Sequence, residues 1–416
     1  MAIIKPFTGV RPTAELAAQV ASLPYDVMNT KEAKTMAEGN PFSFLHVSRA
    51  EIDFADGIDE HSAEVYQKAR HNFYTLIADG TLIKDPQPCI YIYAQAMNGR
   101  TQVGIVACSS IQDYFNNVIK KHEFTRPEKE EDRIKHMETL QAQVGPIFLT
   151  YPQNNTIDSL VQQIITTQKP AYNFTANDAV QHTVWVVSTA DTITEICTLF
   201  ETQIPYTYIA DGHHRTASAA KVGLKLKAQN PHHTGNEPYN FFLSVLFPHN
   251  QLAIMDYNRL VTDLNGHTQQ QLLDKIAIGF DIEKTNLSAT EIKPTQLHHF
   301  AMYMGGSWYK LVAKPALINP DPIGILDVTI LQQNVLAPLL GIQDPRTSNR
   351  VDFVGGIRGL QELQRRVDTG DMQVAFAFYP VSVQQLMNIA DSGHVMPPKS
   401  TWFEPKLRDG LLSHLL

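Results

Sequence analysis

The chain has 416 residues, of which 43% are hydrophobic and 18% are charged, a balance typical of a globular protein and not of a disordered one. Its 34 basic and 42 acidic residues give a formal net charge of −8, which argues against nucleic-acid binding. The three scattered cysteines (Cys89, Cys108 and Cys197) exclude a disulfide framework, and no stretch approaches 18 apolar residues. With no signal-peptide pattern, we expect a cytoplasmic protein that does not enter a membrane.

Helical and strand-like patterns alternate along the whole chain. Helices are expected at 15–22, 60–77, 129–143, 157–167, 192–202, 214–229, 269–278, 325–336, 357–368 and 383–392. Strands are expected at 89–95, 101–107, 147–151, 183–187, 206–209, 239–247, 253–260, 300–304, 308–313 and 374–379. This mixture predicts an α/β to α+β fold with a mixed sheet. The polar run NPHHTGNEP predicts a boundary, so we expect an N-terminal α/β region over 1–235 and a C-terminal α+β region over 236–416.

The run YTYIADGHHRTASAA places a polar cluster between an expected strand and an expected helix. Such a turn leaves backbone N–H groups without helical partners at the positive end of a helix dipole, which suits a phosphate. Asp211 can cap the helix, Gly212 permits a tight turn, and Arg215 offers a fork for phosphate oxygens. His213 and His214 could donate to an anion or shuttle protons. The alternative is a capped helix with surface histidines.

The run KKHEFTRPEKEEDRIKH predicts a helix that begins near Pro127, with acidic residues in its first turns. His122 and Glu123 come just before it. They do not form an HExxH zinc motif, because the second histidine is missing at that spacing. Glu123 could act as a general base or as a ligand for magnesium carried by a nucleotide. The alternative is a solvated helix N-terminus.

Three further motifs carry candidate ligand groups. In the run MPPKSTWFEPKLRDGL, two prolines fix a rigid backbone segment, and the cations and hydroxyls that follow can hold anionic oxygens. The run lacks the glycine-rich segment that begins a P-loop. The run DPRTSNRVDFVGGIRGL sets arginines around a Gly-Gly turn, and SLPYDVMN offers a tyrosine and an acid. A structural tail and simple turns are the alternatives. The candidates are Lys399, Ser400, Thr401, Lys406, Arg346, Arg350, Arg358, Tyr25 and Asp26, with Arg11 upstream.

These motifs together resemble a known family. IKPFTGVRP, LPYDV, NPFSFLHV, HEFTRPEKEEDR, YIADGHHR, RVDFVGGIR and MPPKSTWFEPKLRDGL are similar, in order, to signatures of the bacterial and archaeal family catalogued as domain of unknown function 1015. The DGHHR turn also resembles the phosphate-binding turn of the ParB/sulfiredoxin superfamily, which includes archaeal free-serine kinases and related siderophore-pathway serine kinases. A sulfiredoxin has a cysteine where this chain has His213, so thiol chemistry is not expected. ParB partition proteins add a basic DNA-binding part, which the net charge of −8 argues against.

The resemblance implies a ParB/sulfiredoxin-like nucleotide-binding unit around the DGHHR turn. It implies a kinase that uses ATP or ADP with Mg²⁺ to phosphorylate the hydroxyl of free serine or a related metabolite. The cofactor-binding residues would be Gly212, His213, His214, Arg215, Thr216, Lys399, Ser400, Thr401 and Lys406. The substrate-binding residues would be Arg11, Tyr25, Asp26, Arg346, Arg350 and Arg358.

Glu123 is the expected base for the substrate hydroxyl, with Asp211 or Asp26 as alternatives. The remaining catalytic candidates are His122, His213 and His214, and the metal candidates are Glu123 and Asp211. Two other functions remain open at the same site: a nucleotide-binding regulator without turnover, and a hydrolase of phosphate esters. The expected partner is a small-molecule substrate, and a homodimer is left open.

Overall fold

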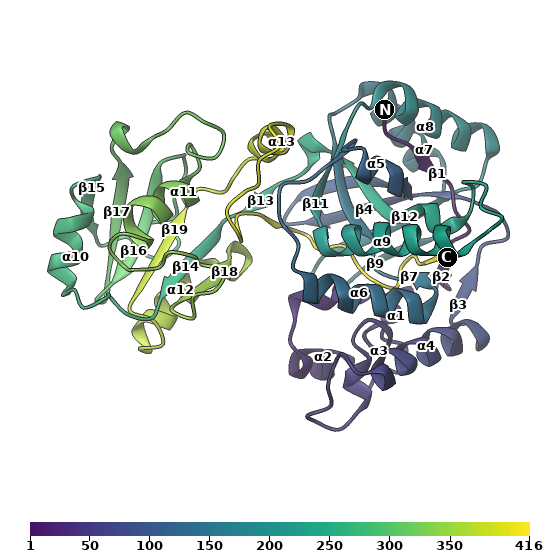
Figure 1. The fold of residues 1–416 in the computed structure, drawn as a ribbon, viewed down its shortest axis with the longest axis horizontal. Coiled ribbons are helices and arrows are strands. Elements are labelled where there is room, and N and C mark those ends of the chain that lie inside the picture. The colour runs from purple at the N-terminus through teal and green to yellow at the C-terminus, as the bar shows by residue number, and fades with distance from the viewer. The chain divides into compact units, whose positions relative to one another are not determined.

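The computed structural model describes residues 1–416, which form two compact units. Unit 1 contains Met1–Leu252 together with Pro405–Leu416, and unit 2 contains Ala253–Glu404. Each unit is a mixture of helices and strands (Figure 1). The predicted mixed α/β fold is therefore confirmed. The division differs from the one expected at residue 235, because the segments 236–252 and 405–416 belong to unit 1.

A nine-stranded mixed sheet forms the centre of unit 1. Its strands, in spatial order, are β6 (Ile119–Lys120), β11 (Thr207–Asp211), β8 (Ile147–Tyr151), β12 (Phe241–Pro248), β5 (Arg100–Ser110), β4 (Ile90–Met97), β10 (Gln181–Val187) and β9 (Tyr172–Thr175), while β1 (Ile4–Lys5) pairs with β5. β11 runs parallel to β6, and the other pairs except β12 with β8 are antiparallel. Parallel neighbours end at the same edge of a sheet. The segments that follow β6 and β11 therefore meet, and this brings the HE and DGHHR motifs together.

The helices of unit 1 bury apolar faces against this sheet and in a second core. They are α1 (Ala17–Val20), α2 (Thr30–Ala37), α3 (Leu45–Ser48), α4 (Ala63–Ala78), α5 (Ile111–Phe115), α6 (Pro127–Leu140), α7 (Asn155–Thr167), α8 (Ala190–Gln203) and α9 (His213–Gln229). On α7, Ile157, Val161 and Ile164 repeat at helical spacing and join the main core. On α9, small residues line the buried face. A Cβ on Gly223 would stand 2.3 Å from the Tyr239 carbonyl oxygen, so α9 packs closely, as its alanine-rich sequence predicts.

A second core of unit 1 surrounds α4, where the Phe73 ring contacts the Phe44 ring edge-on at 6.3 Å. Two small antiparallel ladders border it: β2 (Val10–Pro12) with β3 (Leu82–Lys84), and β7 (Ala142–Gln143) with β21 (His414–Leu415). The second ladder ties the end of the chain to the edge of α6. The last twelve residues therefore help to complete unit 1.

Unit 2 is built on a six-stranded antiparallel sheet. Its order is β15 (Phe280–Thr285), β17 (Ser307–Ala313), β16 (His299–Met304), β19 (Val374–Phe378), β14 (Tyr257–Val261) and β18 (Val351–Gly355), and β13 (Ile254–Met255) pairs separately with β20 (Trp402–Phe403). Its helices are α10 (Gln269–Ile276), α11 (Asp327–Leu331), α12 (Gly359–Asp368) and α13 (Val383–Asp391). Leu360 and Leu363 of α12 pack on the sheet. α11 continues into one π-helical turn, Gln332–Leu336, which accounts for the longer helix predicted at 325–336.

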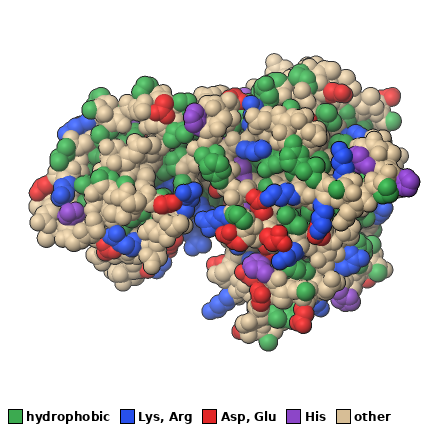
Figure 2. All heavy atoms as spheres, in the orientation of Figure 1, with side chains coloured by type: hydrophobic (Ala, Val, Ile, Leu, Met, Phe, Trp, Pro, Cys, Tyr) green, Lys and Arg blue, Asp and Glu red, His purple; other side chains and the backbone are tan.

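Each predicted helix and strand is present, with ends shifted by a few residues. The largest change is at 15–22, where only α1 is helical. α2, β15, α5 and β18 are the longest elements that the sequence patterns did not predict. None of the helices combines the length and the apolar character needed to cross a lipid bilayer. On the face shown in Figure 2, basic and acidic side chains are interspersed over both units, so that face carries no broad field of one sign.

Candidate functional site

The turn between β11 and α9 passes through Gly212. Its φ of 93° is left-handed, a conformation that residues with a Cβ adopt only at a cost. The expected helix cap by Asp211 is wrong, because Gly212 is the N-cap residue and no side chain caps α9. Instead, Asp211 Oδ1 accepts a hydrogen bond from Gly212 N at 2.9 Å. Thr216 closes the first helical turn, since its N and its Oγ1 both donate to the Gly212 carbonyl oxygen at 2.9 Å.

Asp211 and Lys406 form an ion pair beside this turn, with Lys406 Nζ 3.0 Å from Asp211 Oδ2. The Lys406 side chain is 11% exposed and that of Asp211 is 30% exposed. Burial alone would raise the pKa of Asp211, but the charges of Lys406 and Arg215 outweigh it and lower that pKa well below its usual range. The carboxylate is therefore ionised at neutral pH, and Lys406 places a fixed positive charge next to the helix N-terminus.

The HE motif lies against the first residue of α9. The rings of His122 and His213 meet edge-on with centroids 4.4 Å apart, and His213 Nδ1 is 3.8 Å from Glu123 Oε2. Burial lowers the pKa of His122 to about 4 and lowers that of His213 well below its usual value, so both rings are neutral at pH 7. The Glu123 side chain is 40% exposed. The turn thus has a buried pair of imidazoles with a carboxylate at their open side.

His214 and Arg215, the next two residues of α9, point to different surroundings. His214 Nε2 accepts a hydrogen bond from Arg126 N at 3.0 Å, which fastens the start of α6 to α9. Burial lowers the pKa of His214, in keeping with an accepting, neutral ring. Arg215 is 8% exposed and points inward, where its Nη1 donates to the Pro146 carbonyl oxygen at 2.8 Å.

Arg215 borders a small internal cavity of about 40 Å³ that Tyr25, Arg133 and Asp409 also line. Burial raises the pKa of Asp409 to about 7, Asp26 adds to the rise, and Arg215, Arg133 and Arg408 oppose it. The charges of Asp26 and Asp409 in turn help to raise the pKa of Arg215 against the effect of burial. The cation of Arg215 therefore lies behind the turn, on its interior side.

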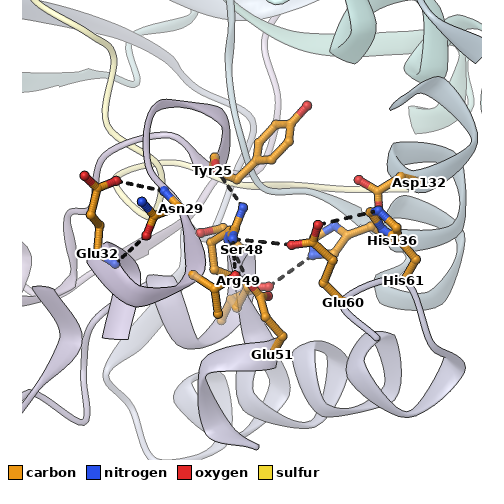
Figure 3. A network of polar contacts seen from close by, with 12 residues as sticks. Tyr25, Asn29, Glu32, Ser48, Arg49, Glu51, Glu60, His61, Asp132 and His136 are labelled. Atoms are coloured by element: carbon orange, nitrogen blue, oxygen red, sulfur yellow. Dashed lines mark hydrogen bonds and ion pairs between the residues drawn. The ribbon is translucent and has the colours of Figure 1, made fainter. Parts of the chain in front are cut away.

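Tyr25 is held in the wall of this cavity by a polar network drawn in Figure 3. Its carbonyl oxygen accepts from Arg49 Nη1 at 3.2 Å, and Arg49 Nε is 2.6 Å from Glu51 Oε1. The Arg133 guanidinium carbon lies 3.9 Å from the centre of the Tyr25 ring. Burial raises the pKa of Tyr25 to about 12, so its hydroxyl stays protonated. Asp132, also shown in Figure 3, accepts from His61 and Tyr66 and holds α6 against α4.

Arg11, another predicted substrate-binding residue, lies in unit 1, and other side chains of that unit occupy its donor groups. Arg11 Nε and Nη2 donate to the Asp85 carboxylate at 2.8–3.0 Å, and Arg11 Nη1 donates to the Tyr172 hydroxyl at 2.8 Å. This arrangement ties β2 to its neighbours. The structure gives Arg11 a structural role, and the prediction that it binds substrate has no support from its contacts.

Unit 2 contains the other predicted residues. Arg346 pairs with Asp344, Arg350 pairs with Asp263, and Arg358 ends the short helix Gly356–Arg358. The predicted cradle at Gly355-Gly356 contains no α-helix N-terminus, because this short 3₁₀ helix intervenes before α12.

Arg259 holds the PPKST loop of unit 2, residues 397–401. Its side chain is 1% exposed and donates to the carbonyl oxygens of Pro398 and Lys399 at 3.0 and 2.8 Å. Ser400 Oγ donates to the Pro397 carbonyl oxygen at 2.6 Å, and Thr401 is half-buried. Lys399 has a φ of 56° and its Nζ lies 5.6 Å from the centre of the Tyr257 ring. The loop is therefore held by hydrogen bonds to two of its carbonyl oxygens and by one within it.

Arg133 and Asp409 lie near the turn, but the sequence motifs did not identify either of them as a site residue. Both line the cavity beside Arg215. Each belongs to a motif that was already singled out, HEFTRPEKEEDR and PKLRDGL, but neither differs in type from the charged residues around it. Only the fold distinguishes them, because burial next to Arg215 sets them apart from solvated neighbours.

Comparisons with known proteins give the following. A family described as "Protein of unknown function (DUF1015)" matches residues 4–329. No curated protein matches the sequence. Similar solved structures include a free serine kinase in complex with AMP (11% identity, TM-score 0.34, covering 72% of this chain and 86% of that one). A C-terminally truncated SbnI from Staphylococcus aureus matches at 12% identity and TM-score 0.38, over 73% of this chain and 85% of that one. A conserved hypothetical protein from Pyrococcus furiosus matches at 12% identity and TM-score 0.34, over 74% and 93%. At these TM-scores the structural matches carry no argument about chemistry.

Proposed function

This chain belongs to the DUF1015 family, and from the geometry of its β11–α9 turn we propose that it is a nucleotide-dependent kinase acting on the hydroxyl of free serine or a related small metabolite. The observation that carries the proposal is the N-terminus of α9. It starts at a left-handed glycine, no side chain caps it, Lys406 pairs with Asp211 beside it, and the Arg215 guanidinium lies next to Gly212. Backbone N–H groups at such a terminus favour bound phosphate.

The phosphates of ATP or ADP would bind at Gly212, His213 and His214. Lys406 would neutralise the charge that develops on the transferred group, since its Nζ already faces the carboxylate of Asp211. Arg215 would act from behind the turn, because its guanidinium points to Pro146 and not to solvent. A nucleotide would approach over the exposed parts of Asp211 and Glu123, because Gly212 and His213 are themselves buried.

Glu123 is the proposed base. As the substrate oxygen bonds to the transferred phosphorus, the bond from that phosphorus to the bridging oxygen breaks and the leaving nucleotide takes the electron pair. Glu123 accepts the hydroxyl proton. Its side chain is the partly exposed member of the HE motif, so it can reach a substrate. Such transfer depends mainly on positioning and charge neutralisation.

Mg²⁺ prefers oxygen ligands and binds through one or two carboxylates together with nucleotide phosphates. Asp211 and Glu123 offer carboxylate oxygens on the two sides of the turn, so they would hold Mg²⁺ that arrives with the nucleotide. When bound, the ion would neutralise phosphate charge.

The test uses the purified full-length protein with Mg²⁺, ATP or ADP, and L-serine or an amino-acid mixture, and detects products by mass spectrometry and ³¹P NMR. A phosphorylated amino acid supports the proposal. Phosphate release that does not depend on an acceptor indicates a hydrolase, and a rise in melting temperature without product indicates a regulator. Glu123→Gln should keep its affinity for nucleotide measured without Mg²⁺ and lose at least about 100-fold in turnover, the usual size of a general-base contribution. Normal turnover in that variant would exclude Glu123 as the base.

A further inference from the structure

Two histidines and a glutamate converge where β6 and α9 meet. His122 and Glu123 follow β6, and His213 is the first residue of α9. One nitrogen of each ring and one oxygen of the carboxylate lie within 4.8 Å of one another, with His213 Nδ1 and Glu123 Oε2 3.8 Å apart. The parallel pairing of β6 with β11, in the register Tyr208 with Lys120, holds the two backbone segments in this position.

The two imidazoles are buried without the hydrogen bonds that buried rings normally have. His122 is 1% exposed and His213 is 6% exposed. Neither nitrogen of His122 makes a well-aligned hydrogen bond, although its ring lies near the Ile209 backbone, and Nε2 of His213 has no partner. An unpaired buried polar atom costs about 1–3 kcal/mol, so such a group in a folded protein calls for a partner, such as an ion or an ordered water, or for a catalytic role.

We propose that His122, Glu123 and His213 form a site for a divalent transition-metal ion of the Zn²⁺ type. Two imidazole nitrogens and a carboxylate oxygen are typical ligands of Zn²⁺, which leave further positions open for water or substrate. Around a tetrahedral ion, ligand atoms about 2.0–2.2 Å from the metal lie about 3.3–3.6 Å apart, so the trio, whose ligand atoms lie within 4.8 Å of one another, has to contract by up to about 1.5 Å. Glu123 can supply that movement, because its side chain is 40% exposed while the two rings are fixed by packing.

This site shares Glu123 with the proposed Mg²⁺ position but differs from it in its other ligands. Mg²⁺ favours oxygen ligands, whereas two of the three donors here are nitrogens. Asp211 is not part of the trio, since its carboxylate pairs with Lys406. The inference does not depend on the proposed kinase activity, because the ion would bind in the absence of nucleotide. A carboxylate that binds an ion through one oxygen keeps the other oxygen for a proton.

The experiment measures metal binding to the full-length protein alone. The protein is stripped with a chelator, and Zn²⁺ is titrated by calorimetry with excess Mg²⁺ present. Co²⁺ is then used as a spectroscopic probe of the ligand set. We expect one Zn²⁺ per chain and a Co²⁺ absorption spectrum with imidazole ligands. His122→Gln, His213→Gln and Glu123→Gln should each lower Zn²⁺ affinity by about 100-fold or more, because each removes a direct ligand.

The matched control is His233→Gln. His233 Nδ1 lies 3.1 Å from Glu237 Oε2, so this variant removes another histidine from a histidine–glutamate pair that lies outside the trio. It should bind Zn²⁺ like the unaltered protein. Circular dichroism and melting of the metal-free variants verify folding, and Glu123→Gln, altered at a partly exposed position, decides the matter if a histidine variant does not fold. Unchanged Zn²⁺ affinity in the trio variants, equal loss in the control, or complete displacement of Zn²⁺ by Mg²⁺ would each overturn the proposal.

Discussion

The conformation of Gly212 allows a sharp test of the turn as a phosphate site. In Gly212→Ala, the new Cβ would meet its nearest neighbour, Arg215 Nε, at 3.4 Å, which is an ordinary contact. The cost therefore comes from the backbone, where a φ of 93° penalises an L-residue by about 1–2 kcal/mol. For a unit of this size that corresponds to a fall in melting temperature of about 2–8 °C.

Gly235→Ala is the matched control. Gly235 has a φ of 94°, and a Cβ there meets nothing within 4 Å, so its backbone cost should be the same. It lies in the loop between α9 and β12, away from the turn. Calorimetric melting without nucleotide should thus show similar destabilisation in both variants.

Nucleotide affinity should distinguish the two. A hydrogen bond to a charged group contributes about 1.5–3 kcal/mol, so losing one amide contact at the turn should weaken binding by about 10- to 150-fold. Titration calorimetry with Mg²⁺ and ATP or ADP should show this loss in Gly212→Ala and none in Gly235→Ala. If both variants bind nucleotide like the unaltered protein while melting lower, the α9 N-terminus does not hold the phosphates and the reasoning fails.

Two further predictions concern buried titratable groups. The folded-state pKa of Asp409 is raised to about 7, so the protonated carboxyl favours folding below pH 4 and this contribution is lost as the pH rises to 7. In the unaltered protein, this lowers the free energy of unfolding by urea at pH 8 relative to pH 5, on the order of 2–4 kcal/mol, and Asp409→Asn should remove that decrease. If the variant shows the same decrease between the two pH values, the pKa of Asp409 is not raised. The pKa of His136 is lowered to about 4 by burial and by Arg133, so stability is lost as the pH falls from 6.5 to 4. In His136→Gln, the new amide can still donate to the Val47 carbonyl oxygen, so the variant should lose less stability in acid in the same assay. Equal loss of stability in the variant and the unaltered protein would contradict the lowered pKa of His136.

The sequence was sufficient to locate the turn but not its surroundings. A short apolar run followed by Asp-Gly and a helix-forming segment predicts a strand, a tight turn and a helix, and all three are present. The approach of His122 to His213 depends on β6, a two-residue strand that pairs with β11 across about ninety positions of sequence. No local pattern encodes such a pairing. The inward direction of Arg215 also follows from tertiary packing, since the same residue type at this place could equally face a ligand.

The two longest strands of unit 2 that escaped prediction, β15 and β18, share a position in the sheet. β15 and β18 are its two edge strands. Edge strands bury less surface and carry charges that discourage further pairing, so their apolar alternation is weak. In β15, Asp281, Glu283 and Lys284 interrupt the pattern. The central strands β16 and β19 are almost fully buried and were predicted with nearly correct ends.

Because segment 405–416 returns to unit 1, unit 2 is in effect an insertion within it. The ion pair between Asp211 and Lys406 spans 195 positions, and β7 finds its partner only in the last residues of the chain. During synthesis, the ion pair between Asp211 and Lys406 can therefore form only after unit 2 has been translated. A fragment ending at residue 252 would lack that cation and leave β7 unpaired, so it should not form the complete turn region.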